Sequence, residues 1–226
     1  MTSLPQIVYL QTMTACNGHC GYCPFDDVYE GKPVERMSIV KHNSIIDWLR
    51  GVGYKGRIGY LLHYEPTMDS RLPKLAAYAK KQLPYSMIEA NTNGIIKDFD
   101  FTSFDVVGVS PAKVLRDATS RAGNCRPVKQ NKGRKRLADP PCIVPMATMP
   151  IAANGNVLLC CQDWRHEAVV GTWEHLDVAR MNQLKFGELA KRTSLEICQD
   201  CMAGKTSKEV GNRLGKRFIS HRESEK

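Results

Sequence analysis

The chain has 226 residues, a formal net charge of +9 and nine cysteines. Its first residues, MTSLPQ, lack the basic and apolar stretches of a secretory signal, and no apolar run is long enough for a membrane helix. We therefore expect a cytoplasmic protein whose cysteines serve metal chemistry rather than a disulfide framework. The length allows a sizeable core but is short for a barrel with an appended domain.

Strands and helices are expected to alternate over the first half of the chain. Apolar runs predict strands, and amphipathic segments between them predict helices. The expected strands are 7–13, 57–64, 85–95 and 104–111, and the expected helices are 38–53 and 71–82. Helices between successive strands imply parallel βαβ units, whose ligand sites lie at the carboxyl ends of the strands. No fifth or sixth strand is evident between residues 112 and 141.

Three cysteines follow the first expected strand in the run CNGHCGYC. They are Cys16, Cys20 and Cys23. Three thiolates on one short loop can bind three irons of a cubane cluster and leave the fourth iron open to a small molecule. A structural zinc site instead closes its tetrahedron with four protein ligands. The alternatives to a cluster are a zinc loop or buried structural thiols.

The character of the sequence changes at about residue 140. Asn154 and Gly155 form a strong hairpin-turn signal between two short apolar runs. The segment 176–194 is expected to be a helix that leads to a CxxC pair. Four thiolates in this region can complete the shell of a closed cluster or of a zinc ion. These four are Cys142, Cys160, Cys198 and Cys201.

Two cysteines and a basic run are left outside these sets. Cys161 adjoins Cys160 on an expected strand, so it should point to the opposite face and pack there. Cys125 lies beside the basic run 126–136 and could be a free thiol. A basic run is typical of a nucleic-acid patch or of a solvated loop, and the lack of interleaved aromatic residues gives base stacking little support.

The CxxxCxxC spacing, with Tyr22 before the last cysteine, resembles the signature of the radical S-adenosylmethionine (radical SAM) enzymes. The order of the later cysteines resembles the SPASM/twitch subfamily, in its shorter form with a single auxiliary [4Fe-4S] cluster. The resemblance covers about residues 5–203. It implies SAM and two [4Fe-4S] clusters as cofactors. The first three cysteines would hold the SAM cluster, and Cys142, Cys160, Cys198 and Cys201 the auxiliary cluster.

The resemblance also implies an α/β fold: an abbreviated partial (β/α) radical SAM barrel, followed by a small twitch-type β-hairpin plus helix cluster-binding domain. We expect the barrel at residues 1–138, the cluster-binding domain at 139–204 and a basic C-terminal tail at 205–226.

Several SAM contacts can be carried over from the family. His63-Tyr64-Glu65-Pro66 stands in the place of a Gly-Gly-Glu-Pro stretch, so Glu65 and Pro66 match while both glycines are missing. Thr92-Asn93-Gly94 matches a TNG motif, although it is also a good turn sequence. The expected SAM-binding residues are Tyr22, Tyr64, Glu65, Asn93 and Ser110.

Substrate contacts are expected from strand alternation. On the third strand Glu89 and Asn91 share one face while Ile88 and Ala90 share the other, and the apolar face should pack on the helices. The polar face would then point into the barrel, where a hydrogen-bonded core network is an equally open interpretation. The substrate candidates are Tyr9, Gln11, His63, Glu89 and Asn91.

In the family, electron transfer to SAM produces a 5′-deoxyadenosyl radical that takes a hydrogen atom from the substrate. A closed auxiliary cluster favours electron transfer from the substrate radical, as in the twitch-type dehydrogenases that oxidise an aminocyclitol. The resemblance thus implies a radical SAM iron–sulfur oxidoreductase, with a small-molecule or peptide substrate and a flavodoxin or ferredoxin as reductant. The alternatives are a peptide-modifying maturase that forms thioethers or epimerises residues, and a non-enzymatic, metal-binding, RNA-associated protein.

Overall fold

The structure is a computed structural model that describes residues 4–20, 23–110, 144–175 and 177–190. The strands are β1 (Ile7–Leu10), β2 (Arg57–Tyr60), β3 (Met87–Thr92), β4 (Val106–Val109), β5 (Thr148–Ile151), β6 (Asn156–Leu158) and β7 (Val169–Thr172). The helices are α1 (Phe25–Tyr29), α2 (Ile39–Gly51), α3 (Leu72–Gln82), α4 (Val144–Ala147) and α5 (Val178–Ala190), with single 3-10 turns η1 (Pro66–Met68) and η2 (Trp173–His175).

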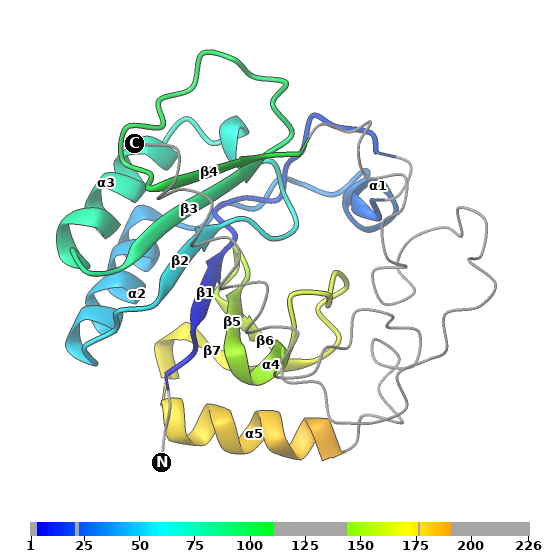
Figure 1. Cartoon of the computed structure of the whole chain (residues 1–226). Helices are drawn as coiled ribbons and strands as arrows, with labels where there is room; N and C mark the ends of the chain where they lie inside the picture. Colours follow the sequence, from blue (N-terminus) through cyan, green and yellow to red (C-terminus); the bar gives the residue numbers. More distant parts are fainter. Residues whose placement is uncertain (1–3, 21–22, 111–143, 176, 191–226) are drawn as a thin grey trace, which may run out of the picture.

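The strands form one sheet in the order β4-β3-β2-β1-β5-β6-β7. The five strands from β4 to β5 are parallel, and β6 and β7 continue the sheet in antiparallel fashion. Figure 1 shows that α2 and α3 cover one face of the parallel strands, whereas α1 lies beyond their carboxyl ends. This arrangement confirms the predicted α/β class and places the cysteine loop at the carboxyl ends of the parallel strands, the edge where such sheets usually bind ligands.

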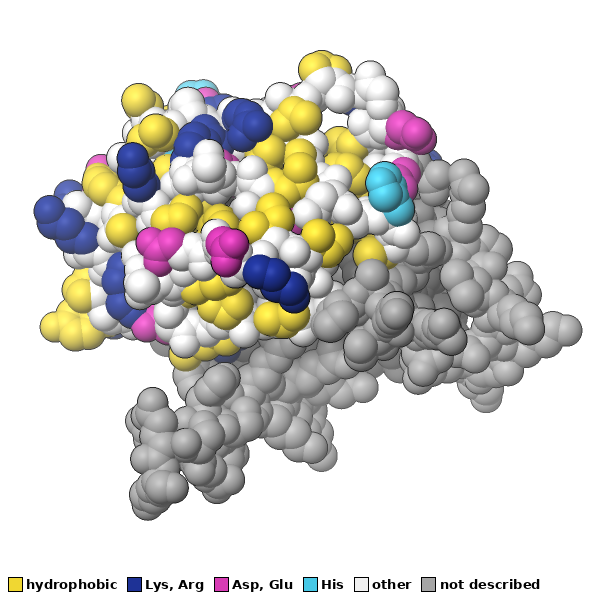
Figure 2. Space-filling view, turned by 90° about the horizontal axis from the view of Figure 1, so that it is seen from above, with side chains coloured by type: hydrophobic (Ala, Val, Ile, Leu, Met, Phe, Trp, Pro, Cys, Tyr) yellow, Lys and Arg dark blue, Asp and Glu magenta, His cyan; other side chains and the backbone are white. Residues whose placement is uncertain are grey.

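On the surface seen in Figure 2, basic and acidic side chains are interspersed with hydrophobic ones over the described residues. The basic run 126–136 and the tail 205–226 lie outside those residues, so their predicted roles stay predictions. No helix in the described part of the chain is both long and apolar enough to cross a membrane.

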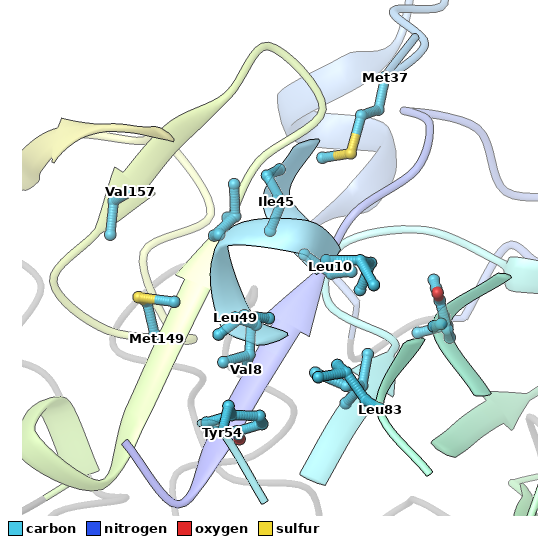
Figure 3. Close-up of a cluster of buried hydrophobic side chains, with 14 of the residues drawn as sticks. Val8, Leu10, Met37, Ile45, Leu49, Tyr54, Leu83, Met149 and Val157 are labelled. Carbon is cyan, nitrogen blue, oxygen red and sulfur yellow. The ribbon is translucent and has the colours of Figure 1, made fainter. Parts of the chain in front are cut away.

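The core lies between the sheet and the two helices (Figure 3). Val8, Leu10 and Ile58 of the sheet pack against Ile45 and Leu49 of α2, and all five side chains are buried. Helix α2 begins where the sequence predicts, because the Ser38 hydroxyl accepts a hydrogen bond from the Lys41 N–H at 3.0 Å. Since alternate residues of a strand point to opposite faces, the other face of these strands is left for the site.

The fifth parallel strand is the first arm of the predicted hairpin, which the sequence analysis had assigned to a separate domain. Strand β5 pairs with β1 in register Ile7↔Thr148, and it begins only after residue 147. The hairpin signal is confirmed, because Gly155 has φ +100° in the turn between β5 and β6. The hairpin therefore continues the sheet of the first half, and the predicted domain boundary at residue 138 stays a prediction.

Candidate functional site

The cysteine loop leaves the sheet at the end of β1. The Cys23 N–H donates to the Cys20 carbonyl at 2.8 Å, and all three cysteines are partly buried. The Gly18 N–H donates to the Cys16 sulfur at 3.4 Å. A Cβ on Gly18 would lie 3.6 Å from the Cys20 sulfur and 3.7 Å from the Cys16 sulfur, so these two sulfurs flank one glycine.

The three thiols of this loop are the donor set that the sequence assigns to an iron–sulfur cluster. Burial raises the pKa of the Cys16 thiol to about 11, and the Glu65 carboxylate and the other two cysteines add to the rise. The thiol therefore stays protonated near neutral pH unless a positively charged centre binds it. Within the described residues, no three Cys, His, Asp or Glu side chains are grouped as ligands of one metal ion.

Glu65 ties the start of the cysteine loop to the end of β3. Its side chain is buried, and its N–H donates to the Ala15 carbonyl at 2.9 Å. One carboxylate oxygen accepts from the Thr67 N–H and hydroxyl and from the Thr92 hydroxyl, and the other accepts from the Asn93 N–H at 2.8 Å. The carboxylate is thus engaged by four donors of the protein itself.

Asn93 bridges β3 to the cysteine loop. Its side-chain N–H donates to Asn17 Oδ1 at 2.8 Å, and its Oδ1 accepts from the Ile95 N–H at 3.0 Å. A Cβ on Gly18 would come within 3.2 Å of Asn93 Nδ2, so the loop and the end of β3 are in close contact. The TNG sequence forms the predicted turn, because Gly94 has φ +73°.

Two other predicted SAM-binding residues, Tyr64 and Ser110, lie apart from the network of Glu65 and Asn93. Tyr64 is buried below the loop with Met13 and Ala15, and its hydroxyl donates to the Leu10 carbonyl at 3.3 Å. Burial raises the pKa of Tyr64, so the phenol stays neutral. Ser110 is exposed at the end of β4, and its N–H donates to the Thr92 carbonyl at 2.8 Å. Tyr22 lies outside the described residues.

The substrate candidates on β1 and β3 share the face away from the helices. The ring of Tyr9 lies over Gly59, where a Cβ would come within 2.9 Å of it. Asn91 lies over Gly108 in the same way, because a Cβ there would overlap Asn91 Oδ1. Tyr9 and Asn91 are half-buried. The two glycines thus make room for the two polar side chains on this face.

Gln11 and Glu89 are instead buried in contacts within the protein. Gln11 donates to the His63 carbonyl at 3.1 Å and accepts from the Ala153 N–H at 3.2 Å. Glu89 forms a buried ion pair with Arg57 at 2.8 Å. These contacts correspond to the core network that the sequence had left open.

His63 joins the loop after β2 to the loop after β6. It is buried, its ring stacks on Trp164 with centroids 4.0 Å apart, and its Nε2 donates to the Cys161 carbonyl at 3.0 Å. His166 lies next to it and contacts the Tyr29 hydroxyl of α1 at 3.4 Å. His63, at the position where the family motif has a glycine, thereby connects the loop after β2 to the segment that carries Cys160 and Cys161.

Of the predicted auxiliary ligands, Cys160 is the one within the described residues; Cys142, Cys198 and Cys201 lie outside them. The Cys160 sulfur accepts from the Gln162 N–H at 3.4 Å, and its side chain packs on the main core. Such N–H···S contacts are typical around cluster thiolates. The prediction that Cys160 and Cys161 lie on a strand and point to opposite faces is wrong, because β6 ends at Leu158. The Cys161 carbonyl instead accepts a hydrogen bond from His63.

Sequence reasoning missed four side chains that shape this region. They are Asn17, Thr92, Trp164 and Lys185, and the fold brings each of them to partners far along the chain. Asn17 and Thr92 could have been suspected, because each lies inside a motif. Trp164 and Lys185 carry no comparable local signal.

Comparisons with known proteins agree with the predicted resemblance. Residues 142–202 match the family model of SPASM, described as an iron-sulfur cluster-binding domain. A curated relative, the S-adenosyl-L-methionine-dependent 2-deoxy-scyllo-inosamine dehydrogenase of Niallia circulans, is 21% identical over 237 residues, which cover 89% of this chain and 94% of the relative.

Two solved structures share the fold. The crystal structure of BtrN in complex with AdoMet and 2-DOIA superposes with a TM-score of 0.70 at 17% identity, and SeMet BtrN in an open conformation with 0.67 at 19%. Each match covers 89% of this chain and 94% of the other. The resemblance to the SPASM/twitch group of radical SAM enzymes is thus confirmed in the fold and in the iron–sulfur domain.

Proposed function

From this resemblance, we propose that the chain is a radical SAM oxidoreductase that oxidises a small molecule. The first cluster and SAM would supply a 5′-deoxyadenosyl radical that removes a substrate hydrogen atom, and an auxiliary [4Fe-4S] cluster would accept the remaining electron as a proton leaves. The observation that carries this proposal is the cysteine loop, which is fixed at the carboxyl edge of the parallel strands beside a face of polar side chains.

In this proposal the residues matched to SAM contacts divide into two groups. Glu65 and Asn93 hold the loop in place, because their side chains already bond Thr67, Thr92 and Asn17. Backbone groups after β2 and β3, together with Tyr22 and Ser110, would then contact SAM. Pre-formed bonds of this kind keep the loop cysteines in one arrangement before a cluster binds.

The substrate candidates divide in the same way. We assign substrate contact to Tyr9 and Asn91, since both are half-buried on the face away from the helices. Gln11, His63 and Glu89 would position the surrounding loops, because each is buried in bonds to other parts of the protein. A polyol or aminocyclitol fits two such polar side chains, and the dehydrogenase named above supports this substrate class.

Anaerobic reconstitution tests the proposal. We expect iron and sulfide for two four-iron clusters, and formation of 5′-deoxyadenosine from SAM with dithionite or a reduced flavodoxin. Cys16→Ala should abolish 5′-deoxyadenosine formation. Cys160→Ala should lower the iron content by about half, whereas the adjacent Cys161→Ala serves as the matched control and should keep both clusters.

The substrate class is tested by incubating the reconstituted protein with a panel of aminocyclitols and with short peptides. Stoichiometric oxidation of an aminocyclitol, one molecule per 5′-deoxyadenosine, is the expected result. Modification of a peptide instead would replace the proposal by the peptide-modifying alternative. Bound zinc, with no SAM cleavage after iron loading, would overturn the proposal that the chain is a radical SAM enzyme.

A further inference from the structure

A chain of three hydrogen-bonded side chains lies on the same face of the sheet as Tyr9. Gln11 follows Tyr9 by two residues, and its N–H still pairs with the Ile151 carbonyl at 3.0 Å, so both side chains point away from the helices. Gln11 Nε2 lies 3.5 Å from the Tyr29 hydroxyl, which in turn lies 3.4 Å from His166 Nε2. Tyr29 and His166 therefore stand on the proposed substrate face, one step closer along the chain to the cysteine loop.

The partners of Gln11 fix the direction of these hydrogen bonds. Its Oε1 accepts from the Ala153 N–H at 3.2 Å, so its amide N–H groups point toward the His63 carbonyl at 3.1 Å and toward Tyr29. The Tyr29 oxygen thus accepts a hydrogen bond from Gln11, and its single proton is left for His166. Nε2 is then the unprotonated nitrogen of a neutral imidazole.

The loop between β6 and β7 holds His166 in this place. The Asp163 carboxylate closes the loop by accepting from the N–H groups of Glu167 at 2.9 Å and Ala168 at 2.8 Å. The ring of His166 stacks on His63, with centroids 5.9 Å apart. Its backbone has φ +57°, a left-handed conformation that a residue with a Cβ adopts at an energetic cost. Glycine or asparagine would suit this conformation better, so the fold alone does not require a histidine here.

The environment keeps both members of the pair neutral at pH 7. Burial lowers the pKa of His166, and the charge of Lys32 acts in the same direction, whereas the carboxylates of Asp163 and Glu35 act against it. Burial raises the pKa of Tyr29, so its phenol stays protonated. A neutral imidazole that accepts from a neutral phenol can take up one proton.

Oxidation of an alcohol by hydrogen abstraction needs such a proton acceptor. Once a hydrogen atom has left the carbon, the remaining radical becomes a ketone by losing its hydroxyl proton and one electron. With the substrate hydroxyl against Tyr29, its proton passes to the Tyr29 oxygen while the Tyr29 proton passes to His166 Nε2. The substrate O–H bond breaks, the C=O bond and an N–H bond on His166 form, and the electron goes to the iron–sulfur acceptor of the proposed function.

We propose that Tyr29 and His166 form the proton relay of this oxidation, in which Tyr29 takes the proton of the substrate hydroxyl and His166 receives the proton of Tyr29. This inference rests on the proposed function, because that function supplies the alcohol and the electron acceptor. Tyr29 would touch the substrate, whereas His166 acts through Tyr29. Hydrogen bonds between such groups are often long before a substrate binds, which fits the 3.4 Å between them.

The first test needs no substrate. Nitrogen-15 spectra of the histidines in the reconstituted full-length chain, with its clusters kept oxidised, should show His166 neutral at pH 7 with its proton on Nδ1. Tyr29→Phe keeps the ring that packs on Phe25 but removes the donor to the neutral imidazole. The preference for Nδ1 should then be lost, and the pKa of His166 should rise. Tyr85→Phe, at an exposed tyrosine, is the matched control and should leave the His166 signals unchanged.

The second test follows the reaction of an aminocyclitol from the panel described above, with deuterium on its carbinol carbons. The side chain of His166→Asn suits the left-handed backbone, so the fold should be kept. Deuterium should still reach 5′-deoxyadenosine in this variant, but ketone should form about 100-fold more slowly. Tyr29→Phe should behave in the same way. His175→Asn, at an exposed histidine, should form one ketone per 5′-deoxyadenosine like the unsubstituted protein.

The pH dependence separates a proton relay from a structural role. Ketone formation by the unsubstituted protein should fall about tenfold per pH unit below the pKa of His166, because a protonated imidazole cannot accept a proton. In His166→Asn hydroxide has to remove the proton, so the rate should rise about tenfold per pH unit between pH 7 and pH 9. A packing defect would lower the rate by the same factor at every pH.

The outcomes are distinct. A His166 tautomer and pKa that do not respond to Tyr29→Phe would overturn the inference, and so would one ketone per 5′-deoxyadenosine in His166→Asn. Equal loss of deuterium transfer and ketone would also overturn it, because the variant would then have damaged the site as a whole. Absence of deuterium transfer from every aminocyclitol in the unsubstituted protein would count against the proposed function, while the nitrogen-15 spectra would still decide whether the two side chains form the pair.

Discussion

The side chain of Asn93 donates a hydrogen bond to Asn17 at 2.8 Å, across 76 residues of sequence. Asn17 stands inside the first cysteine motif and Asn93 directly follows β3. The bond fixes the loop that carries Cys16 and Cys20 to the edge of the sheet. Asn93 of the TNG sequence therefore positions the cysteine loop, a role that the family resemblance had not suggested.

Asn93→Asp removes the donor but keeps the acceptor for the Ile95 N–H. We expect the loop to loosen by about 1 kcal/mol, the usual net contribution of one hydrogen bond. Iron should then leave the first cluster about fivefold faster when a chelator is added. Asn154→Asp, a change of the same chemistry in the β5–β6 turn, should leave the rate unchanged.

Glu65→Gln is expected to destabilise the protein even without cofactors. The carboxylate now accepts hydrogen bonds from groups of Thr67, Thr92 and Asn93. The amide of the variant would place an N–H donor opposite at least one of these donors. One unsatisfied buried donor costs about 2 kcal/mol, which urea unfolding of the cofactor-free protein can measure. The exposed Glu174→Gln is the control. Equal stability of both variants would mean that Glu65 serves a ligand rather than the fold.

Breaking the buried pair of Arg57 and Glu89 is expected to be costly. Glu89→Leu leaves the Arg57 guanidinium buried and should lower the free energy of unfolding by about 3–5 kcal/mol. The double variant Arg57→Met/Glu89→Leu should recover a large part of this loss. The same cycle on the exposed pair of Arg165 and Glu167 should give a coupling of about 0–1 kcal/mol. Additive losses at Arg57 and Glu89 would contradict the prediction.

His42 makes the stability sensitive to mild acid. Burial lowers its pKa to about 4 from the ordinary 6.5, and its Nε2 contacts the Tyr60 hydroxyl at 2.7 Å. Between these two pH values the unfolded chain binds a proton that the folded protein excludes. The free energy of unfolding should therefore fall by about 3 kcal/mol as the pH drops from 6.5 to 4.

Urea unfolding at pH 7 and at pH 4.5 measures this dependence. His42→Gln should be less stable than the unsubstituted protein at pH 7 and should lose less stability at pH 4.5. His175→Gln, at an exposed histidine, should keep the full loss. An unaltered slope in His42→Gln would assign the acid sensitivity to other groups.

Much of the local structure follows from the sequence because it depends on near neighbours. The Ser38 cap, the turn at Gly155 and the alternation of Ile88 and Ala90 with Glu89 and Asn91 are each set by residues within a few positions. The strands are shorter than predicted, since residues 11–15 and 61–65 leave the sheet to build the site. The order of the later cysteines likewise predicts the iron–sulfur domain that matches residues 142–202, because thiols are the usual protein ligands of such clusters.

Only the tertiary structure decided which distant residues meet. Strand β5 pairs with β1 across more than half of the chain, and no local pattern encodes that pairing. The same sheet order brings Glu65 to Thr92, His63 to Trp164 and Lys185 to the α4–β5 junction. Buried polar groups are stable only when such long-range partners satisfy them, so their roles are fixed by the fold and not by their neighbours in sequence.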